Sequence, residues 1–106
     1  MATTTVPTTM TPGAMALAKE LGLERELEAI LEQGRRTVKG LRSYQVSADT
    51  ESSMGPVIIV EAKVDPDADG DPSHLAWWSW RIDQFGPDVA SDFIVIVEAD
   101  EAADAR

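Results

Sequence analysis

The chain contains no cysteine, so its 106 residues form neither disulfides nor thiolate metal sites. It also lacks any run of about 18 apolar residues, the length that a membrane-spanning helix requires. Residues 1–10 carry no charge and have neither the basic start nor the apolar centre of a secretory signal. From these absences we expect a cytoplasmic protein that does not bind a membrane.

Basic residues are scarce, with 9 Lys and Arg against 19 Asp and Glu, which gives a net charge of −10. The charge is uneven, because residues 1–48 carry +1 and residues 49–106 carry −11. Such a surface repels phosphate backbones, so we do not expect a nucleic-acid partner. The acidity favours solubility, a basic protein partner or a cation.

Hydrophobic periodicity predicts the secondary structure. Thr11-Pro12 and Gly22 mark the two ends of a first helix, and a second helix is expected over 24–38. Alternating residues over 41–49 and 57–64 predict two strands, and the short connection makes them an antiparallel hairpin. A third helix is expected from about residue 72 until Gly86-Pro87 ends or breaks it, with a buried stripe of Leu75, Trp78, Ile82 and Phe85. Residues 93–99 then form a last strand.

We therefore expect one α+β domain over residues 12–99, between a disordered Thr-rich leader (1–11) and an acidic tail (100–106). The predicted order is helix or helices, strand, strand, helix, strand. The sheet would be three-stranded and mixed, with helices packed on one face; one solution places the 41–49 strand between the other two. This arrangement resembles half of a ferredoxin-like domain, a resemblance that says nothing about function.

Four aspartates alternate with other residues in a tight acidic loop: Asp65, Asp67, Asp69 and Asp71. Calcium prefers six to eight hard oxygens, and Gly70 in sixth place would allow the sharp turn. The segment 65–71 resembles the first half of an EF-hand loop, which implies a calcium site. The twelfth position, where that family has a bidentate Glu, is Ala76, so Glu61 or Asp83 would have to complete the site. The alternative is a solvated turn whose aspartates cap the next helix.

A second cluster of chemistry-bearing residues lies on the predicted hairpin, where Glu61 and Lys63 share one face and Asp49 ends the preceding strand. This spacing resembles the PD-(D/E)xK nucleases, which would imply that Asp49 and Glu61 hold magnesium while Lys63 helps to activate water. The alternative is a charged pair on a solvent-facing strand end, and the acidic surface favours it.

Three of the six aromatic residues are tryptophans within four positions of the third predicted helix. Trp77 and Trp80 lie beside the predicted stripe and either widen it or form an interface patch. The outer faces of the last two strands are also apolar, at Val57, Ile59, Ile94 and Ile96, and require a cover from the N-terminal helices or a second copy. We therefore expect a non-enzymatic interaction module that forms homo-oligomers, such as a homodimer. Calcium binding and a divergent nuclease remain the alternatives.

Overall fold

A computed structural model of the chain describes residues 7–51, 53, 55–68 and 70–99. Its strands are β1 (Thr8–Met10), β2 (Leu41–Asp49), β3 (Val57–Val64) and β4 (Phe93–Ala99). Its α-helices are α1 (Pro12–Leu21), α2 (Glu24–Thr37) and α3 (Pro72–Ala90), and a short 3-10 helix spans Pro66–Ala68. The α+β class, the hairpin and the last strand therefore agree with the sequence prediction.

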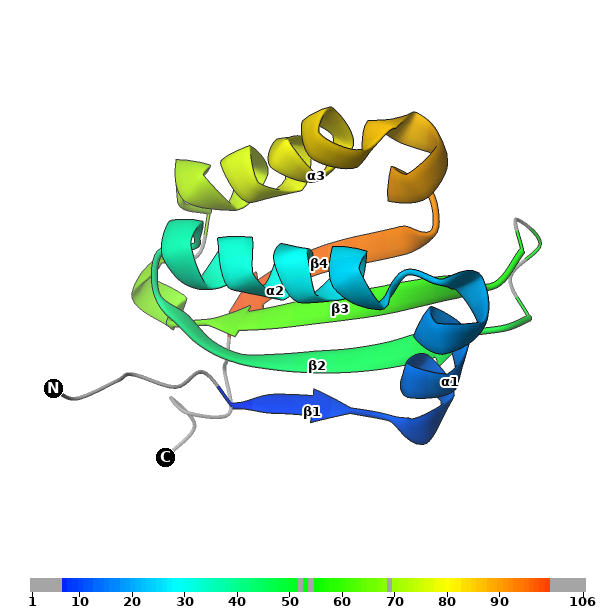
Figure 1. The fold of residues 1–106 in the computed structure, drawn as a ribbon. Helices are drawn as coiled ribbons and strands as arrows, with labels where there is room; N and C mark the ends of the chain where they lie inside the picture. The colour runs from blue at the N-terminus through cyan, green and yellow to red at the C-terminus, as the bar shows by residue number, and fades with distance from the viewer. Residues whose placement is uncertain (1–6, 52, 54, 69, 100–106) are drawn as a thin grey trace, which may run out of the picture.

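The described residues form one mixed sheet of four strands in the order β1-β2-β3-β4. β1 runs parallel to β2, β2 is antiparallel to β3, and β3 runs parallel to β4. The chain therefore consists of two strand–helix–strand units joined by the central β2–β3 hairpin. Figure 1 shows α2 and α3 on the same side of the sheet, and no helix of the described residues covers the opposite face.

Two parts of the predicted sheet are wrong. The sheet has four strands among the described residues rather than three, because residues 8–10 of the expected leader pair with Tyr44, Gln45 and Val46. The central position between β2 and β4 belongs to β3, not to the 41–49 strand, so the sheet is not a ferredoxin-like half. Residues 1–6 of the expected leader and the tail 100–106 lie outside the described part of the chain.

The helix ends follow the local signals in the sequence. The Thr11 hydroxyl accepts a hydrogen bond from the Ala14 amide at 3.1 Å and caps α1. Gly22 ends α1 with φ +69, a left-handed conformation that glycine adopts without strain. Gly86, with φ 80 and ψ 164, interrupts α3, as the Gly86-Pro87 pair predicted.

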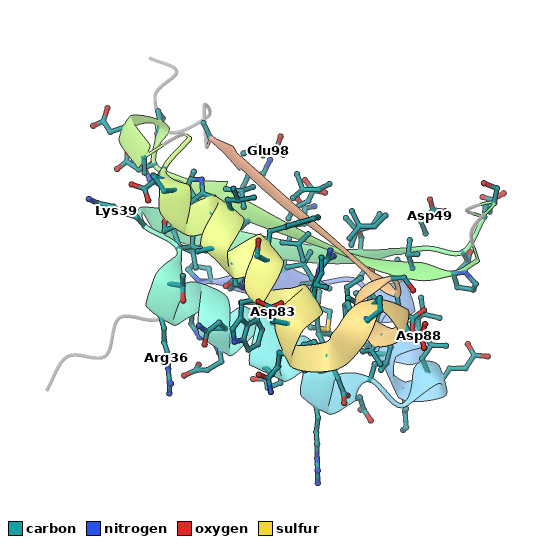
Figure 2. The ribbon with its side chains drawn as sticks, turned by 90° about the horizontal axis from the view of Figure 1, so that it is seen from above. Arg36, Lys39, Asp49, Asp83, Asp88 and Glu98 are labelled. Atoms are coloured by element: carbon teal, nitrogen blue, oxygen red, sulfur yellow. The ribbon has the colours of Figure 1, made fainter. Side chains whose placement is uncertain are left out.

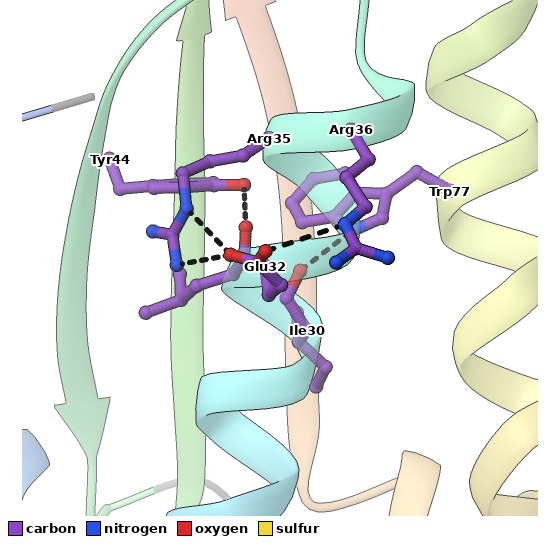
Figure 3. A network of polar contacts seen from close by, with 7 residues as sticks. Ile30, Glu32, Arg35, Arg36, Tyr44 and Trp77 are labelled. Atoms are coloured by element: carbon purple, nitrogen blue, oxygen red, sulfur yellow. Dashed lines mark hydrogen bonds and ion pairs between the residues drawn. The ribbon is translucent and has the colours of Figure 1, made fainter. Parts of the chain in front are cut away.

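The centre of the core is a close contact of α2 with β2 and α3 (Figure 3). The Tyr44 hydroxyl donates to the Leu31 carbonyl at 2.8 Å, and Trp77 Nε1 donates to the Ile30 carbonyl at 2.9 Å. The two rings lie 6.0 Å apart between centroids and enclose Gly34, where a Cβ would lie 2.0 Å from the Tyr44 oxygen. The close approach of α2 to both rings therefore requires glycine at position 34.

The predicted orientation of α3 is wrong. Trp77 is 1% exposed and lies in the core, whereas Trp78 is 41% exposed and Leu75 is 66% exposed. Arg81 is also buried, four positions after Trp77 on the same helix face, although the predicted stripe did not include it. Trp77 faces inward because the space beside Gly34 admits its ring and the Ile30 carbonyl satisfies its N–H.

Candidate functional site

Three of the four predicted calcium ligands line one hollow. Asp65, Asp67 and Asp71 surround a surface cavity of about 340 Å³, together with Lys39. Asp69 lies outside the described residues. Lys39 is close enough for its positive charge to help lower the pKa of Asp71, so the local charge is less favourable for a cation than the sequence suggests.

The carboxylates of this loop already accept hydrogen bonds from the chain. Asp65 Oδ1 accepts from the Asp67 amide at 3.2 Å, and its Oδ2 pairs with Arg42 at 3.3 Å. Asp71 Oδ1 accepts from the Ser73 amide at 2.9 Å and caps α3, and the hydrogen bonds of Ser73 hold the pKa of Asp71 below its usual range. This is the helix-capping alternative. Across residues 7–51, 53, 55–68 and 70–99, no three His, Cys, Asp or Glu side chains are grouped to hold a metal ion.

The nuclease-like residues share a face of the hairpin but do not converge. Asp49 pairs with Val57, and Glu61 lies four residues further along β3. At a rise of about 3.3 Å per residue this separates Asp49 and Glu61 by roughly 13 Å, too far for one magnesium ion. Figure 2 shows Asp49 at the turn end of the strands, while Glu98 lies towards the other end.

Lys63 lies between two carboxylates. Its Nζ is 3.9 Å from Glu61 Oε2, and it donates a hydrogen bond to Glu98 on the neighbouring strand. That hydrogen bond is the largest cause of the lowered pKa of Glu98. An ammonium group held in this way neutralises the charged end of the open face, and the arrangement matches the strand-end alternative.

The tryptophans expected at an interface are not on the surface together. Trp77 is 1% exposed and lies in the core, which matches the alternative in which it widens the buried stripe, and an interface through Trp77 and Trp80 stays a prediction. Trp80 is half-buried and makes an edge-to-face contact with Phe85, with 5.5 Å between ring centroids. The exposed aromatic ring of α3 is instead Trp78, which lies over the guanidinium of Arg81 at 5.2 Å from the ring centroid.

Of the four apolar side chains that the sequence predicted on the open face of the sheet, two are exposed and Ile59 is half-buried, but Val57 is buried, at 5% exposure. Ile94 and Ile96 of β4 are 42% and 39% exposed. In the parallel register Ile94 lies beside Ile59 and Ile96 beside Glu61. The other face of β3 is covered, since Ile58 and Val60 are 0% exposed, and on β4 the same face is buried at Phe93 and half-buried at Val95 and Val97. We define the open face as Val57, Ile59, Glu61, Lys63, Ile94, Ile96 and Glu98.

The sequence analysis did not find Arg81 as a candidate functional residue. Its burial follows from the spacing Ser73, Trp77, Arg81, which places all three on one helix face. Recognising this required the knowledge that Trp77, rather than Trp78, faces the core.

Comparison with protein-family models, with curated protein sequences and with solved structures finds no match to this chain. Within the part of the chain that the structure describes, no helix has the length and apolar character needed to span a membrane.

Proposed function

We propose that this chain is a non-enzymatic, cytoplasmic protein-interaction module that self-associates through the open face of its sheet. The supporting observation is the exposure of Ile94 and Ile96, at 42% and 39%, beside Ile59 on a face that no described helix covers. Antiparallel sheets that face water usually alternate apolar with polar side chains. Here the apolar residues lie on both faces of β4, next to a free strand edge.

A second copy of the chain can cover the open face, because a two-fold axis places the same apolar surface of each copy against the other. The apolar residues lie at one end of the open face, and Lys63 lies between Glu61 and Glu98 at the other. Packing the apolar ends against each other leaves the charged ends near solvent. The interface then buries no unpaired charge, which is the main cost that opposes association.

The exposed apolar area supports an order-of-magnitude value for the free energy of the proposed association. Fully burying one isoleucine contributes about 1.5–3 kcal/mol, so the exposed part of each isoleucine contributes about 1 kcal/mol. The four isoleucines of two copies together supply about 4 kcal/mol, against the association cost of at least about 4 kcal/mol. Val57 is only 5% exposed, so the half-buried Ile59 must supply the surplus, and the dimer should be weak and depend on concentration.

Sedimentation equilibrium from micromolar to millimolar protein tests the proposal. We expect a monomer–dimer equilibrium that strengthens with sodium chloride, because each copy carries −10 and salt screens the repulsion. Ile94→Lys combined with Ile96→Lys should abolish the dimer. The matched control is Leu75→Lys with Met15→Lys, which changes the charge equally at exposed positions on the helices.

Either of two results would contradict the proposal. The first is a wild-type chain that stays monomeric at millimolar concentration in high salt. The second is a dimer that survives the two strand substitutions but is lost in the helix control, which would place the interface on the helical side.

A further inference from the structure

Arg81 is a buried cation without a counter-charge. Only 8% of the residue is exposed, although it belongs to a helix of the surface layer. Its Nη1 donates to the Phe93 carbonyl at 2.6 Å, and Trp78 lies over the guanidinium. Its Nε is buried without a hydrogen-bond partner, and none of the described carboxylates forms an ion pair with it.

This environment is costly for a guanidinium. The group carries five N–H donors, and proteins almost always pair a buried charge. Burial lowers the pKa of Arg81, yet arginine remains protonated in proteins at neutral pH. Among the described residues only the Phe93 carbonyl accepts a hydrogen bond from this guanidinium, and a guanidinium with unused N–H groups is a good partner for a carboxylate.

Arg81 lines a pocket that is the right size for a small molecule. The pocket has a volume of about 230 Å³, and its other walls are Ile82, Pro87, Ala90, Ser91 and Phe93. The non-helical Gly86 shapes it, because the turn there carries Pro87 and Ala90 past the end of the first part of α3. Ser91 Oγ already donates to the Asp88 carbonyl at 2.7 Å, so the walls are mainly apolar.

We propose that this pocket binds a small organic monocarboxylate, whose carboxylate pairs with the guanidinium of Arg81 while its apolar body contacts Ile82, Pro87 and Phe93. One cation in an apolar pocket suits a single negative charge. A phosphate dianion is a poorer fit, because residues 49–106 carry a net charge of −11. The site does not depend on self-association, since all of its walls belong to one copy.

The Nε–H of Arg81 gives a direct measurement. In the full-length, ¹⁵N-labelled protein its resonance is assigned by its loss in Arg81→Lys. We then titrate the protein with sodium acetate, butyrate and inorganic phosphate, against sodium chloride at equal ionic strength. We expect a saturable downfield shift of the Nε–H signal with both carboxylates. Butyrate should bind about tenfold more tightly than acetate, because it buries two more methylene groups at about 0.8 kcal/mol each.

Arg81→Met should eliminate butyrate binding, and it keeps an apolar side chain of similar length in the buried position. The matched control is Arg25→Met, which removes an exposed arginine from α2 and should leave binding unchanged. The proposal is overturned if butyrate produces no saturable shift, or if chloride produces the same shift. Tighter binding of phosphate than of butyrate would also overturn it. If Arg81→Met does not fold, these titrations of the wild-type protein still decide the outcome.

Discussion

Replacing Gly34 by alanine tests the contact at the centre of the core. The new Cβ would lie 2.0 Å from the Tyr44 oxygen and 2.9 Å from Trp77 Cε2, closer than non-bonded atoms approach. Neither ring can move away freely, because the Tyr44 hydroxyl donates a hydrogen bond to the Leu31 carbonyl and Trp77 Nε1 donates one to the Ile30 carbonyl. The substitution therefore forces α2 away from the sheet or breaks one of these hydrogen bonds.

Two effects of opposite sign decide how much Gly34→Ala changes the free energy of unfolding. Alanine is favoured over glycine within a helix by about 1 kcal/mol. Overpacking a filled core costs about 1–3 kcal/mol, and losing the Tyr44 hydrogen bond costs about 1 kcal/mol more. The overlap outweighs the helix propensity, so we expect the free energy of unfolding to fall by about 1–3 kcal/mol. For a domain of this size the melting temperature then falls by roughly 5–20 °C.

Urea and thermal unfolding measure this change, and Gly13→Ala is the matched control. A Cβ at Gly13 has one neighbour within 4 Å, the Thr11 hydroxyl at 4.0 Å. That substitution should be neutral or stabilise by up to about 1 kcal/mol. Adding Tyr44→Phe to Gly34→Ala removes the clashing oxygen, so the double variant should lose less stability than the two single variants together. A Gly34→Ala protein as stable as Gly13→Ala would refute the reasoning.

Other predictions concern titration, capping and the two alternative chemistries, calcium binding and nuclease activity. Burial raises the pKa of Tyr44 above its ordinary value of about 10. The neutral Tyr44 side chain therefore contributes its full share of the free energy of unfolding below about pH 10, and that share declines above it as the unfolded chain ionises. The urea midpoint should fall less at alkaline pH in Tyr44→Phe than in the wild-type protein. Asp71→Ala removes the α3 cap and should lower the melting temperature more than Asp67→Ala; equal losses would contradict this. Millimolar calcium should stabilise no more than sodium chloride of equal ionic strength, and a specific rise lost in Asp67→Ala would restore the calcium hypothesis. Magnesium-dependent cleavage of DNA or RNA should be absent, and activity lost in Lys63→Ala would contradict this.

Local signals predicted most of the elements. The alternation over 41–49 and 57–64 predicted β2 and β3 with their observed bounds, because one face of each strand is buried in the core. The ends of α1 and the break in α3 were predicted correctly at Thr11, Gly22 and Gly86. Each of these residues acts through its own backbone conformation or through a hydrogen bond to a residue a few positions away.

Elements set by distant contacts were missed. Thr8-Thr9-Met10 has no apolar alternation, and it becomes β1 through pairing with β2, more than thirty residues later. The rotation of α3 depends on the Ile30 carbonyl and the space at Gly34, which belong to another helix. Of the candidate sites, the apolar open face followed from strand alternation, whereas the pocket at Arg81 required the observed rotation of α3.

The central hairpin has a kinetic consequence. β2 and β3 are joined by a short turn, so they can pair at low loop-closure cost before either helical crossover is complete. β1 and β4 each join afterwards, at opposite edges and through long connections. In native-state hydrogen exchange the amides in the middle of β2 and β3 should therefore be the last to exchange, and those of the three-residue β1 the first among the strands.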